Sequence, residues 1–437
     1  MSSFRAALAA SALVLAAASP AAAATAPFAD YHMHAISPDA IKLSRADEPS
    51  PIPTPAELEP LLRARVVGWN SQEALAPLYA QDAVVLDAGR QSWAFGHKAA
   101  VKYMAEQFAR PYRMVVLEAK LTGDTGRVAG QYVRGEGAAA KPFGSFLITL
   151  RKGGDKGWRI VTEANDFPGP RLLDPIDGDK LVAELDAAGI RKGVILSVAY
   201  WFGSPLMAKP EGDEYAKVKA ENDWAAAQAA RHPTRLVFFC SVNPLKDYAV
   251  AEVERCATRL HAKGLKMHFG NSVVDTTKPE HVAKVKAVFA AANRRGMALQ
   301  PHLWTGEIPY TAAHARGFLE NLLPAAPDVP VIIAHFAGGG PGYTDEALEV
   351  YAEAIQKGDP RTRNLYFDVA TVADQQTPAT LQKFAERIRQ IGPRRVLFGH
   401  DAGPPAPRES WLNFRLSVPL TDAEFETIAA NRMPYLD

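Results

Sequence analysis

The chain has 437 residues, of which 48% are hydrophobic, so it is longer than one ordinary domain and can bury a large core. Its 49 basic and 48 acidic residues give a formal charge of +1, with no long run of either sign. This balance argues against a nucleic-acid or anionic-membrane surface and leaves a small molecule as the expected binding partner.

The first 24 residues follow the order of features of a secretory signal peptide. Arg5 supplies a positive charge, residues 6–18 are apolar, and an alanine-rich stretch with an Ala-x-Ala pattern comes next. The apolar run is too short for a comfortable transmembrane helix. We therefore predict that residues 1–24 are removed, that no membrane span remains, and that the mature protein is periplasmic or secreted.

A short apolar run at residues 28–34 ends in His32 and His34. In a β-strand, side chains alternate between faces, so these two imidazoles point the same way and can bind one metal ion. A catalytic zinc ion usually has three protein ligands and an open position for water. The pair therefore predicts a metal site only if further ligands recur later in the chain.

Residues 53–167 read as a separate α+β domain. Helical patterns at 55–71 and 98–109 are followed by alternating runs at 113–120, 125–135, 144–152 and 157–164. This segment resembles the nuclear-transport-factor-two-like or SnoaL-like cone fold, in which a curved sheet and helices surround a pocket. The resemblance rests on Trp69-Asn70 and on residues 75–79, 82–87, 95–98 and 157–163.

After residue 174 the pattern alternates strictly between helices and strands. Seven runs read as strands, each preceded by a helical stretch, at residues 192–198, 235–242, 264–269, 297–302, 329–335, 364–369 and 395–399. With the strand at 28–34 they make eight, which predicts a closed (β/α)₈ barrel formed by residues 25–52 and 168–437. The α+β domain at 53–167 is then inserted between the first strand and its helix, beside or above the active-site end.

Polar side chains gather at the carboxyl ends of five of these strands, which meet at one end of a barrel. The residues concerned are His32, His34, Lys266, His268, His302, His335 and Asp401. Singly, each has a plain alternative, such as a helix cap for His335 or Asp401. Jointly they predict a metal site. The two cysteines, Cys240 and Cys256, are interpreted as small core residues, with a disulfide in an oxidising compartment as the alternative.

With these motifs the chain is similar to the amidohydrolase superfamily, in the branch of amidohydrolase-related hydrolases and decarboxylases that includes aminocarboxymuconate-semialdehyde decarboxylase. The resemblance implies a TIM barrel that binds one divalent metal ion. Its ligands would be His32, His34, His302 and Asp401. His335 would stay nearby, as a second ligand or as a group for proton transfer and substrate orientation. Zinc is the expected ion, and manganese is the main alternative, because three histidines and an aspartate suit several metals.

Two positions depart from the pattern of many relatives. His400 stands where a small residue is usual before the aspartate, and it either adds a contact or faces the helices. Lys266 occupies the strand on which other branches carry a carbamylated lysine that bridges two metals. We expect it to bind substrate or to be structural, and we keep a second metal as the alternative.

The site predicts a metal-dependent hydrolase of an amide, lactone or ester bond in a small organic substrate. Asp401 would take the proton of the attacking water, and His335 and His268 would stabilise the developing oxyanion or orient the substrate. The first alternative is a non-oxidative decarboxylase of a small aromatic or unsaturated acid. It requires cations over the metal, for which the candidates are Lys266, Arg171 and Arg191.

A third hypothesis is an inactive barrel whose inserted domain binds a ligand. Four residues of that domain are candidates for lining its pocket, with turn and core roles as the alternative: Tyr79, Asp82, Asp87 and His97. The inserted domain is otherwise expected to be a lid or a contact of a homodimer.

Aromatic residues follow two of the barrel strands. Trp201 and Trp304 are expected at the mouth of the site, where they would bind substrate together with Lys266. Packing against the inserted domain is the alternative.

Overall fold

The structure is a computed structural model that describes residues 25–44, 50–88, 92–108, 111–135, 141–154, 157–166, 175–303, 310–403 and 405–437. The predicted signal peptide at residues 1–24 lies outside the described residues, as do Arg171 and Trp304. Within the described part of the chain, no helix is both long enough and apolar enough to cross a membrane.

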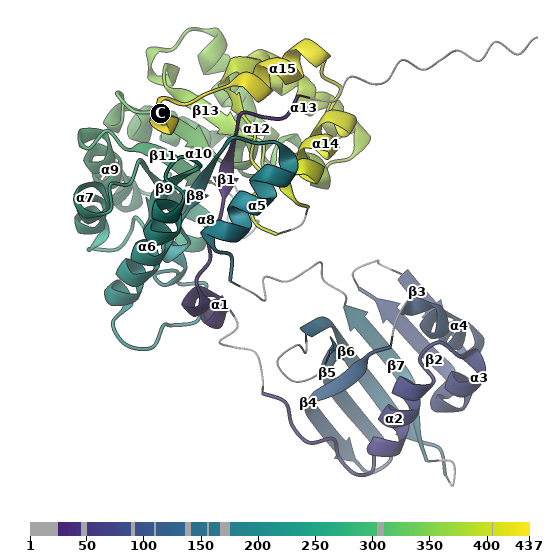
Figure 1. Cartoon of the computed structure of the whole chain (residues 1–437). Coiled ribbons are helices and arrows are strands. Elements are labelled where there is room, and N and C mark those ends of the chain that lie inside the picture. The colour runs from purple at the N-terminus through teal and green to yellow at the C-terminus, as the bar shows by residue number, and fades with distance from the viewer. Residues whose placement is uncertain are drawn as a thin grey trace, which may run out of the picture.

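Eight parallel strands form one sheet, and Figure 1 shows them ringed by helices. In sheet order they are β1 (Ala29–Met33), β8 (Lys192–Leu196), β9 (Leu236–Ser241), β10 (Gly264–His268), β11 (Ala298–His302), β12 (Val331–Ile333), β13 (Leu365–Asp368) and β14 (Val396–Leu397). The sheet closes on itself because Met33 pairs in parallel with Asp401, whose amide donates a 2.7 Å hydrogen bond to the His32 carbonyl. The predicted (β/α)₈ barrel is confirmed.

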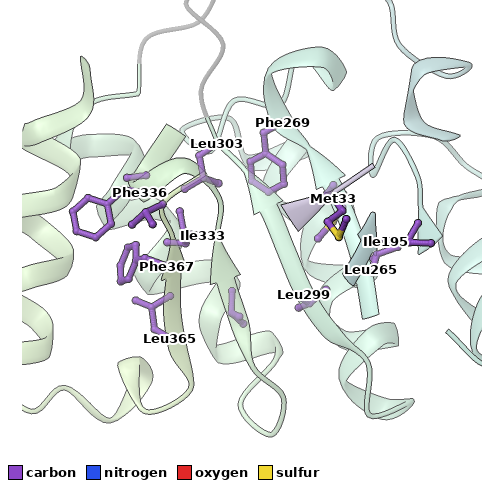
Figure 2. Close-up of a cluster of buried hydrophobic side chains, with 14 of the residues drawn as sticks. Met33, Ile195, Leu265, Phe269, Leu299, Leu303, Ile333, Phe336, Leu365 and Phe367 are labelled. Atoms are coloured by element: carbon purple, nitrogen blue, oxygen red, sulfur yellow. The ribbon is translucent and has the colours of Figure 1, made fainter. Parts of the chain in front are cut away.

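The main core lies between the strands and the surrounding helices. Figure 2 shows part of it, where Met33, Ile195 and Leu265 project from strands in a layer of apolar side chains. The helices that cover the barrel are α5 (Gly178–Ala188), α6 (Glu214–Arg231), α7 (Ala249–Arg259), α9 (Pro279–Arg294), α10 (Ala312–Gly317), α12 (Pro341–Gln356), α13 (Pro378–Ile391), α14 (Pro407–Ser417) and α15 (Asp422–Ala430).

One of these helices departs from the predicted pattern. The helical stretch expected before the strand at 329–335 keeps α geometry only through α10 and continues as a π-helix over Phe318–Leu322. Phe318 is fully buried and packs edge-on against Phe289 of α9, at a centroid distance of 5.9 Å. A sequence pattern with a period of 3.6 residues does not distinguish this wider turn from an α-helix.

A second, smaller core joins barrel strands to the C-terminal residues Met433 and Leu436. The Tyr31 hydroxyl donates a 2.9 Å hydrogen bond to the Asn431 carbonyl and accepts one of 3.1 Å from the Met433 amide. The short 3₁₀ helix Pro434–Leu436 then packs Tyr435 edge-on against Tyr31, with their ring centroids 6.5 Å apart. Hydrogen bonds and a ring contact therefore hold β1 against the C-terminal residues.

The inserted domain has its own six-stranded sheet and its own core. In sheet order its strands are β3 (Ser92–Phe95), β2 (Tyr79–Asp87), β7 (Trp158–Asp166), β6 (Lys141–Lys152), β5 (Thr125–Arg134) and β4 (Arg113–Thr122). Its helices are α2 (Glu59–Val67), α3 (Gln72–Leu75) and α4 (His97–Gln107). The sheet is mixed, because β2 runs parallel to β7. The predicted α+β insertion after the first strand is confirmed.

A buried ion pair lies in the core of the inserted domain. Arg65 of α2 and Glu163 of β7 are both fully buried, and an Arg65 Nη2 to Glu163 Oε1 distance of 3.1 Å joins them. The hydroxyls of Tyr79 and Tyr132 donate to the same carboxylate, and Arg65 donates to the Tyr112 hydroxyl. This network ties the first helix of the domain to three of its strands and to the residue that precedes β4.

The four residues considered for a pocket in this domain differ in their surroundings. Tyr79 and Asp87 are buried, and Asp87 accepts hydrogen bonds from Tyr103 and Gln107. Asp82 is exposed and pairs with Arg151, and His97 hydrogen-bonds through Nε2 to the Ala76 carbonyl at 2.9 Å. Asp82 and His97 therefore make surface and turn contacts, while Tyr79 and Asp87 face the domain interior.

A short helix that follows the first barrel strand, α1 (Pro38–Ser44), is fixed by a buried carboxylate. Glu221 of α6 accepts hydrogen bonds from the Ser37 amide, at 3.3 Å, and from the Ser37 hydroxyl. Ser37 in turn accepts from the Ala40 amide and so caps the helix. Burial, with a contribution from Asp39, raises the pKa of Glu221 to about 7. Ser37, Glu221 and Lys217 line one cavity of about 300 Å³, and the Lys217 ammonium pairs with Asp39.

We expect Glu221→Gln to stabilise the protein at pH 8 and not at pH 5. The folded-state pKa of Glu221 is raised, so its favourable contribution is complete below the unfolded pKa of about 4.3 and is lost as the pH rises through 7. Glutamine mimics the protonated side chain, so the free energy of unfolding should exceed that of the wild type by up to ~3 kcal/mol at pH 8. Urea unfolding at the two pH values measures this, and exposed Glu211→Gln is the matched control. Equal effects of Glu221→Gln at both pH values would refute the prediction.

Candidate metal centre

Three imidazoles surround one carboxylate at the carboxyl end of the barrel. The Nε2 atoms of His32, His34 and His335 lie 3.8, 3.2 and 3.7 Å from the nearest carboxylate oxygens of Asp401. The imidazoles are almost fully buried, while the Asp401 side chain is 29% exposed. The carboxyl ends of β1, β12 and β14 and the residues that follow them therefore bring together four of the residues that the sequence indicated.

Hydrogen bonds on the far side of each ring fix these histidines. The Nδ1 atoms of His34 and His335 lie 2.8 Å from the carbonyls of Leu196 and Ala370, which can only accept. Both rings therefore carry a proton on Nδ1 and direct Nε2 towards Asp401. Such outer contacts are what a metal-binding histidine needs to hold its tautomer and ring orientation.

The third histidine depends on Asp368, a residue that the sequence analysis did not select. His32 Nδ1 lies 3.0 Å from the Asp368 carboxylate at the end of β13. The same carboxylate accepts 3.0 and 3.2 Å bonds from the amides of His335 and Ala370, and 2.9 Å from Gln300 Nε2. Although burial opposes its charge, His32 and its other neighbours hold the pKa of Asp368 far below the usual range. Its position, an aspartate at the end of a barrel strand, was the available signal.

Lys266 enters the same cluster from β10. Its Nζ lies 2.9 Å from His32 Nε2, so the ammonium donates to the lone pair that a metal would use. Burial lowers the pKa of Lys266 to about 8, and burial together with Lys266 lowers the pKa of His32 to about 3. His32 is therefore a neutral imidazole, the form that binds a metal.

The two remaining predicted histidines stack beside this group. The ring of His302 stacks on that of His268, with a centroid distance of 3.9 Å. The centroid of the His302 ring also lies 4.4 Å from that of His335. Burial is the main cause that lowers the pKa of both His268 and His302 well below the ordinary value. Tyr200 packs against His268 at 5.1 Å, and its neighbour Trp201 packs at the edge of the barrel core.

Two of the site residues, His335 and Asp401, have left-handed backbone conformations. His335 has a φ of 51°, and the next three residues are also left-handed, with φ values of 48°, 70° and 100°. Asp401 has a φ of 77°. Such angles cost about 1–2 kcal/mol for residues other than glycine, and they concentrate at functional sites. Gly399 is required nearby, because a Cβ there would lie 2.6 Å from the His32 Cβ.

His400 does not join the cluster. Its Nδ1 lies 2.7 Å from Asp30 Oδ2, and its Nε2 lies 4.0 Å from Glu184 on α5. Burial opposes protonation of His400, but Asp30 and Glu184 raise its pKa. Of the two interpretations of this residue, the structure shows the one in which it faces the surrounding helices.

The donor set fits a divalent metal ion. Ligand atoms of His32, His335 and Asp401 lie within 4.8 Å of one another, and His34 approaches the same carboxylate. Neutral imidazoles and an ionised carboxylate are ligands that zinc and manganese accept. Although burial opposes its charge, His32 and the other histidines hold the pKa of Asp401 well below its usual range. The expected role of His302 as a ligand stays a prediction, and its ring centroid lies 4.4 Å from that of His335.

We expect Asp368→Asn to weaken metal binding by roughly 10- to 100-fold, because the amide no longer provides the charged acceptor that orients His32. Metal retained after dialysis against graded chelator concentrations gives the affinity. Asp345→Asn is the matched control, because Asp345 pairs with Arg387 on the outer helices. Unchanged affinity in Asp368→Asn would show that the orientation of His32 does not depend on this carboxylate.

Comparison with known proteins shows the family of this chain. The family model described as amidohydrolase matches residues 204–431, more than half of the 437 residues. The chain belongs to the amidohydrolase family. The expected relationship is therefore confirmed, and the matched region includes His268, His302 and His335 as well as Asp368 and Asp401. No curated protein matches this amidohydrolase by sequence.

Several solved structures are similar to parts of this amidohydrolase. The 5-carboxyvanillate decarboxylase of Sphingomonas paucimobilis is 20% identical, with a TM-score of 0.41 over 57% of this chain and 79% of that one. The same enzyme of Novosphingobium aromaticivorans, complexed with manganese and 4-hydroxy-3-methoxy-5-nitrobenzoic acid, is 16% identical, with a TM-score of 0.40 over 59% and 79%. A ketosteroid isomerase-like protein of Erwinia carotovora atroseptica is 17% identical, with a TM-score of 0.23 over 26% and 96%.

Proposed function

We propose that this amidohydrolase is a metal-dependent hydrolase of an amide, lactone or ester bond in a small organic substrate. The observation that carries the proposal is the Asp401 carboxylate, held ionised within 3.8 Å of three imidazole Nε2 atoms. One divalent ion, zinc or manganese, would be held by His32, His34, His302 and Asp401, with His335 beside them. When bound, such an ion would supply a Lewis acid that polarises a carbonyl and lowers the pKa of a water.

The residues of the chain divide the remaining work. Asp401 is an ionised and partly exposed carboxylate, so it can accept the proton of the attacking water and return it to the leaving group. His335 and His268 would contact a substrate oxygen. The Lys266 ammonium offers a positive charge to an anionic substrate group, and Trp201 and Trp304 would wall the mouth.

A second candidate is a non-oxidative decarboxylase, and the position of Lys266 favours it. A buried ammonium 2.9 Å from His32 can bind a carboxylate. Arg191, which was also considered, directly precedes β8 and lies at the amino end of the barrel, where its amide bonds to Phe28. Of the candidate cations among the described residues, Lys266 is therefore the one at the site.

Metal analysis followed by a substrate panel tests the proposal. Plasma mass spectrometry of the purified wild type should find about one equivalent of zinc or manganese, which His34→Ala and Asp401→Ala lose. The loaded protein is then given amides, lactones, esters and aromatic acids, with acid release and CO₂ release recorded in parallel. The proposal is supported if the wild type hydrolyses any of these substrates and the Asp401→Asn variant does not.

The other outcomes are equally informative. CO₂ release without hydrolysis would replace the proposal by the decarboxylase. Two equivalents of metal would indicate a bridging role for Lys266. The absence of metal after reconstitution would refute both reactions and favour the hypothesis of an inactive barrel.

A further inference from the structure

A buried carboxyl group lines a cavity that is separate from the metal centre. Glu221 of α6 is 2% exposed, and the cavity of about 300 Å³ that it lines lies between α6, the start of α1 and the segment after β8. Helix α1 lies next to α6, as Figure 1 shows. None of the candidate metal ligands lines this space, which we call the Glu221 cavity.

The hydrogen bonds to this carboxyl group come from one residue of the described part of the chain. Ser37 donates through its amide to Oε1, at 3.3 Å, and through its hydroxyl to Oε2. No lysine, arginine or histidine among the described residues forms an ion pair with Glu221. A carboxylate oxygen has two acceptor positions, so each oxygen has room for one more donor. An ionised Glu221 would thus be a buried charge without a counter-ion, which is costly in free energy.

The charges around Glu221 leave the cavity negative once that residue ionises. Lys217 lines the cavity, but its ammonium lies 3.0 Å from the Asp39 carboxylate, so these two charges cancel. Burial, with a contribution from Asp39, raises the pKa of Glu221 to about 7. Above that pH, one uncompensated negative charge remains. The Asp39 and Lys217 side chains are 61% and 37% exposed, so this wall of the cavity is open to solvent.

Further charged groups lie next to the cavity, in contact with solvent. A second hollow shares three of the lining residues and adds Lys42, Lys209 and Glu211. Lys42 and Glu211 are 77% and 92% exposed and lie 3.9 Å apart, and Lys209 is exposed as well. Exposed charges are screened by water and salt, so they act weakly compared with a counter-ion in contact. They therefore do not replace the missing cation of Glu221.

The remaining walls of the cavity suit a short hydrocarbon chain. Phe202 and Trp224 line it together with Pro38 and Ala220. Aromatic rings attract ammonium ions as well as apolar groups, and the volume is at the lower limit for a small-molecule site. A primary ammonium group supplies the positive charge and the N–H donors that Glu221 lacks.

We propose that the Glu221 cavity binds a small primary alkylammonium ion, which donates to the Glu221 carboxylate and packs its chain against Phe202 and Trp224. The ion takes the place of the counter-charge that the chain does not provide there. The inference is independent of the proposed reaction, because no candidate metal ligand takes part in it.

Titration calorimetry of the purified protein with n-butylammonium chloride tests the inference. At pH 8 we expect one site with a Kd of about 1 mM or below, the range for a ligand of about five non-hydrogen atoms. Saturating butylammonium should also raise the Tm. n-Butanol has a similar size and no charge, so it is the matched control ligand and should bind at least ~10-fold more weakly.

Three variants locate the binding site. Glu221→Gln keeps the shape of the side chain and removes its charge, so it should fold and bind butylammonium at least ~10-fold more weakly. Glu211→Gln is the matched control, because Glu211 is exposed. Asp401→Asn should bind butylammonium as the wild type does, which distinguishes the Glu221 cavity from the metal centre.

The affinity should also depend on pH, with a defined sign. Butylammonium stays protonated at pH 6 and at pH 8, as a lysine ammonium does. With a pKa of about 7, Glu221 is mostly protonated at pH 6 and mostly ionised at pH 8. Because only the ionised form offers the counter-charge, the apparent Kd should be roughly 10-fold higher at pH 6. Glu221→Gln should show no such change.

Several results would overturn the inference. They are absence of binding at pH 8, equal affinity of the wild type and Glu221→Gln, and an affinity that is the same at pH 6 and pH 8. Loss of binding in Asp401→Asn would place the ion at the metal centre instead. Lys217→Gln tests the last alternative. If this variant binds butylammonium and the wild type does not, Lys217 itself is the counter-ion of Glu221 and the inference is wrong.

Discussion

Asp401→Asn is expected to lower kcat/KM by about 10³-fold on any substrate that the site turns over. The change removes the negative charge and the proton acceptor, and the loss of a general base typically costs 10²- to 10⁴-fold. Asparagine is the informative replacement because Asp401 has a φ of 77°, a left-handed conformation that asparagine adopts more readily than most residues. Steady-state kinetics on the substrate identified by the panel gives the value.

The control for this experiment is the same aspartate-to-asparagine substitution at a position outside the metal centre. Asp345→Asn removes an ion pair with Arg387 between α12 and α13, and it should leave kcat/KM unchanged. Metal content and circular dichroism are measured on both variants, so loss of the ion is distinguished from loss of the base. An Asp401→Asn variant that folds and retains full activity would remove Asp401 from the mechanism.

Arg65→Met is expected to destabilise the inserted domain by about 3–5 kcal/mol. The substitution leaves the Glu163 carboxylate fully buried without its cation, and breaking a buried ion pair typically costs this much. Hydrogen exchange of peptides from β5 to β7 reports the stability of this domain within the whole chain. The barrel peptides should keep their exchange rates, because the two sheets have separate cores.

Two further variants sharpen this result. Arg127→Met breaks an ion pair with Glu118 that is about half exposed on both sides, and it should change stability by less than ~1 kcal/mol. The double variant Arg65→Met/Glu163→Met removes both buried charges, so it should be more stable than Arg65→Met alone. If Arg65→Met is as mild as Arg127→Met, the tyrosine hydroxyls satisfy Glu163 without the arginine.

Features that follow from the periodicity of strands and helices could be predicted from the sequence. Features that depend on an irregular local backbone geometry could not. His32 and His34 were placed on one face by strand alternation, and the structure aims both at Asp401. The left-handed turn that starts at His335 was not predicted, because Phe336 and Ala337 are not residues that favour a positive φ. Tertiary contacts of the turn, including the Asp368 carboxylate on the His335 amide, hold it.

Asp368 was missed for a different reason. Two strands end in pairs of polar residues two positions apart, His32 with His34 and Lys266 with His268, whereas Asp368 stands alone at the end of a short apolar run. Its partners, His32 and Gln300, are far away in sequence. A residue that acts through its neighbours becomes visible only when the strands are assembled, so the outer contacts of a metal site are the hardest part to predict from one sequence.

The closure of the barrel through β1 has a consequence for the order of synthesis. Strand β1 pairs with β8 on one side, and on the other side His32 and Met33 bond with the segment after β14. All strands of the inserted domain leave the ribosome before β8, and β14 follows some 200 residues later. The inserted domain can therefore fold first, while β1 keeps an open edge until the last strand arrives. The two histidines of β1 are thus made first, and their site is completed last.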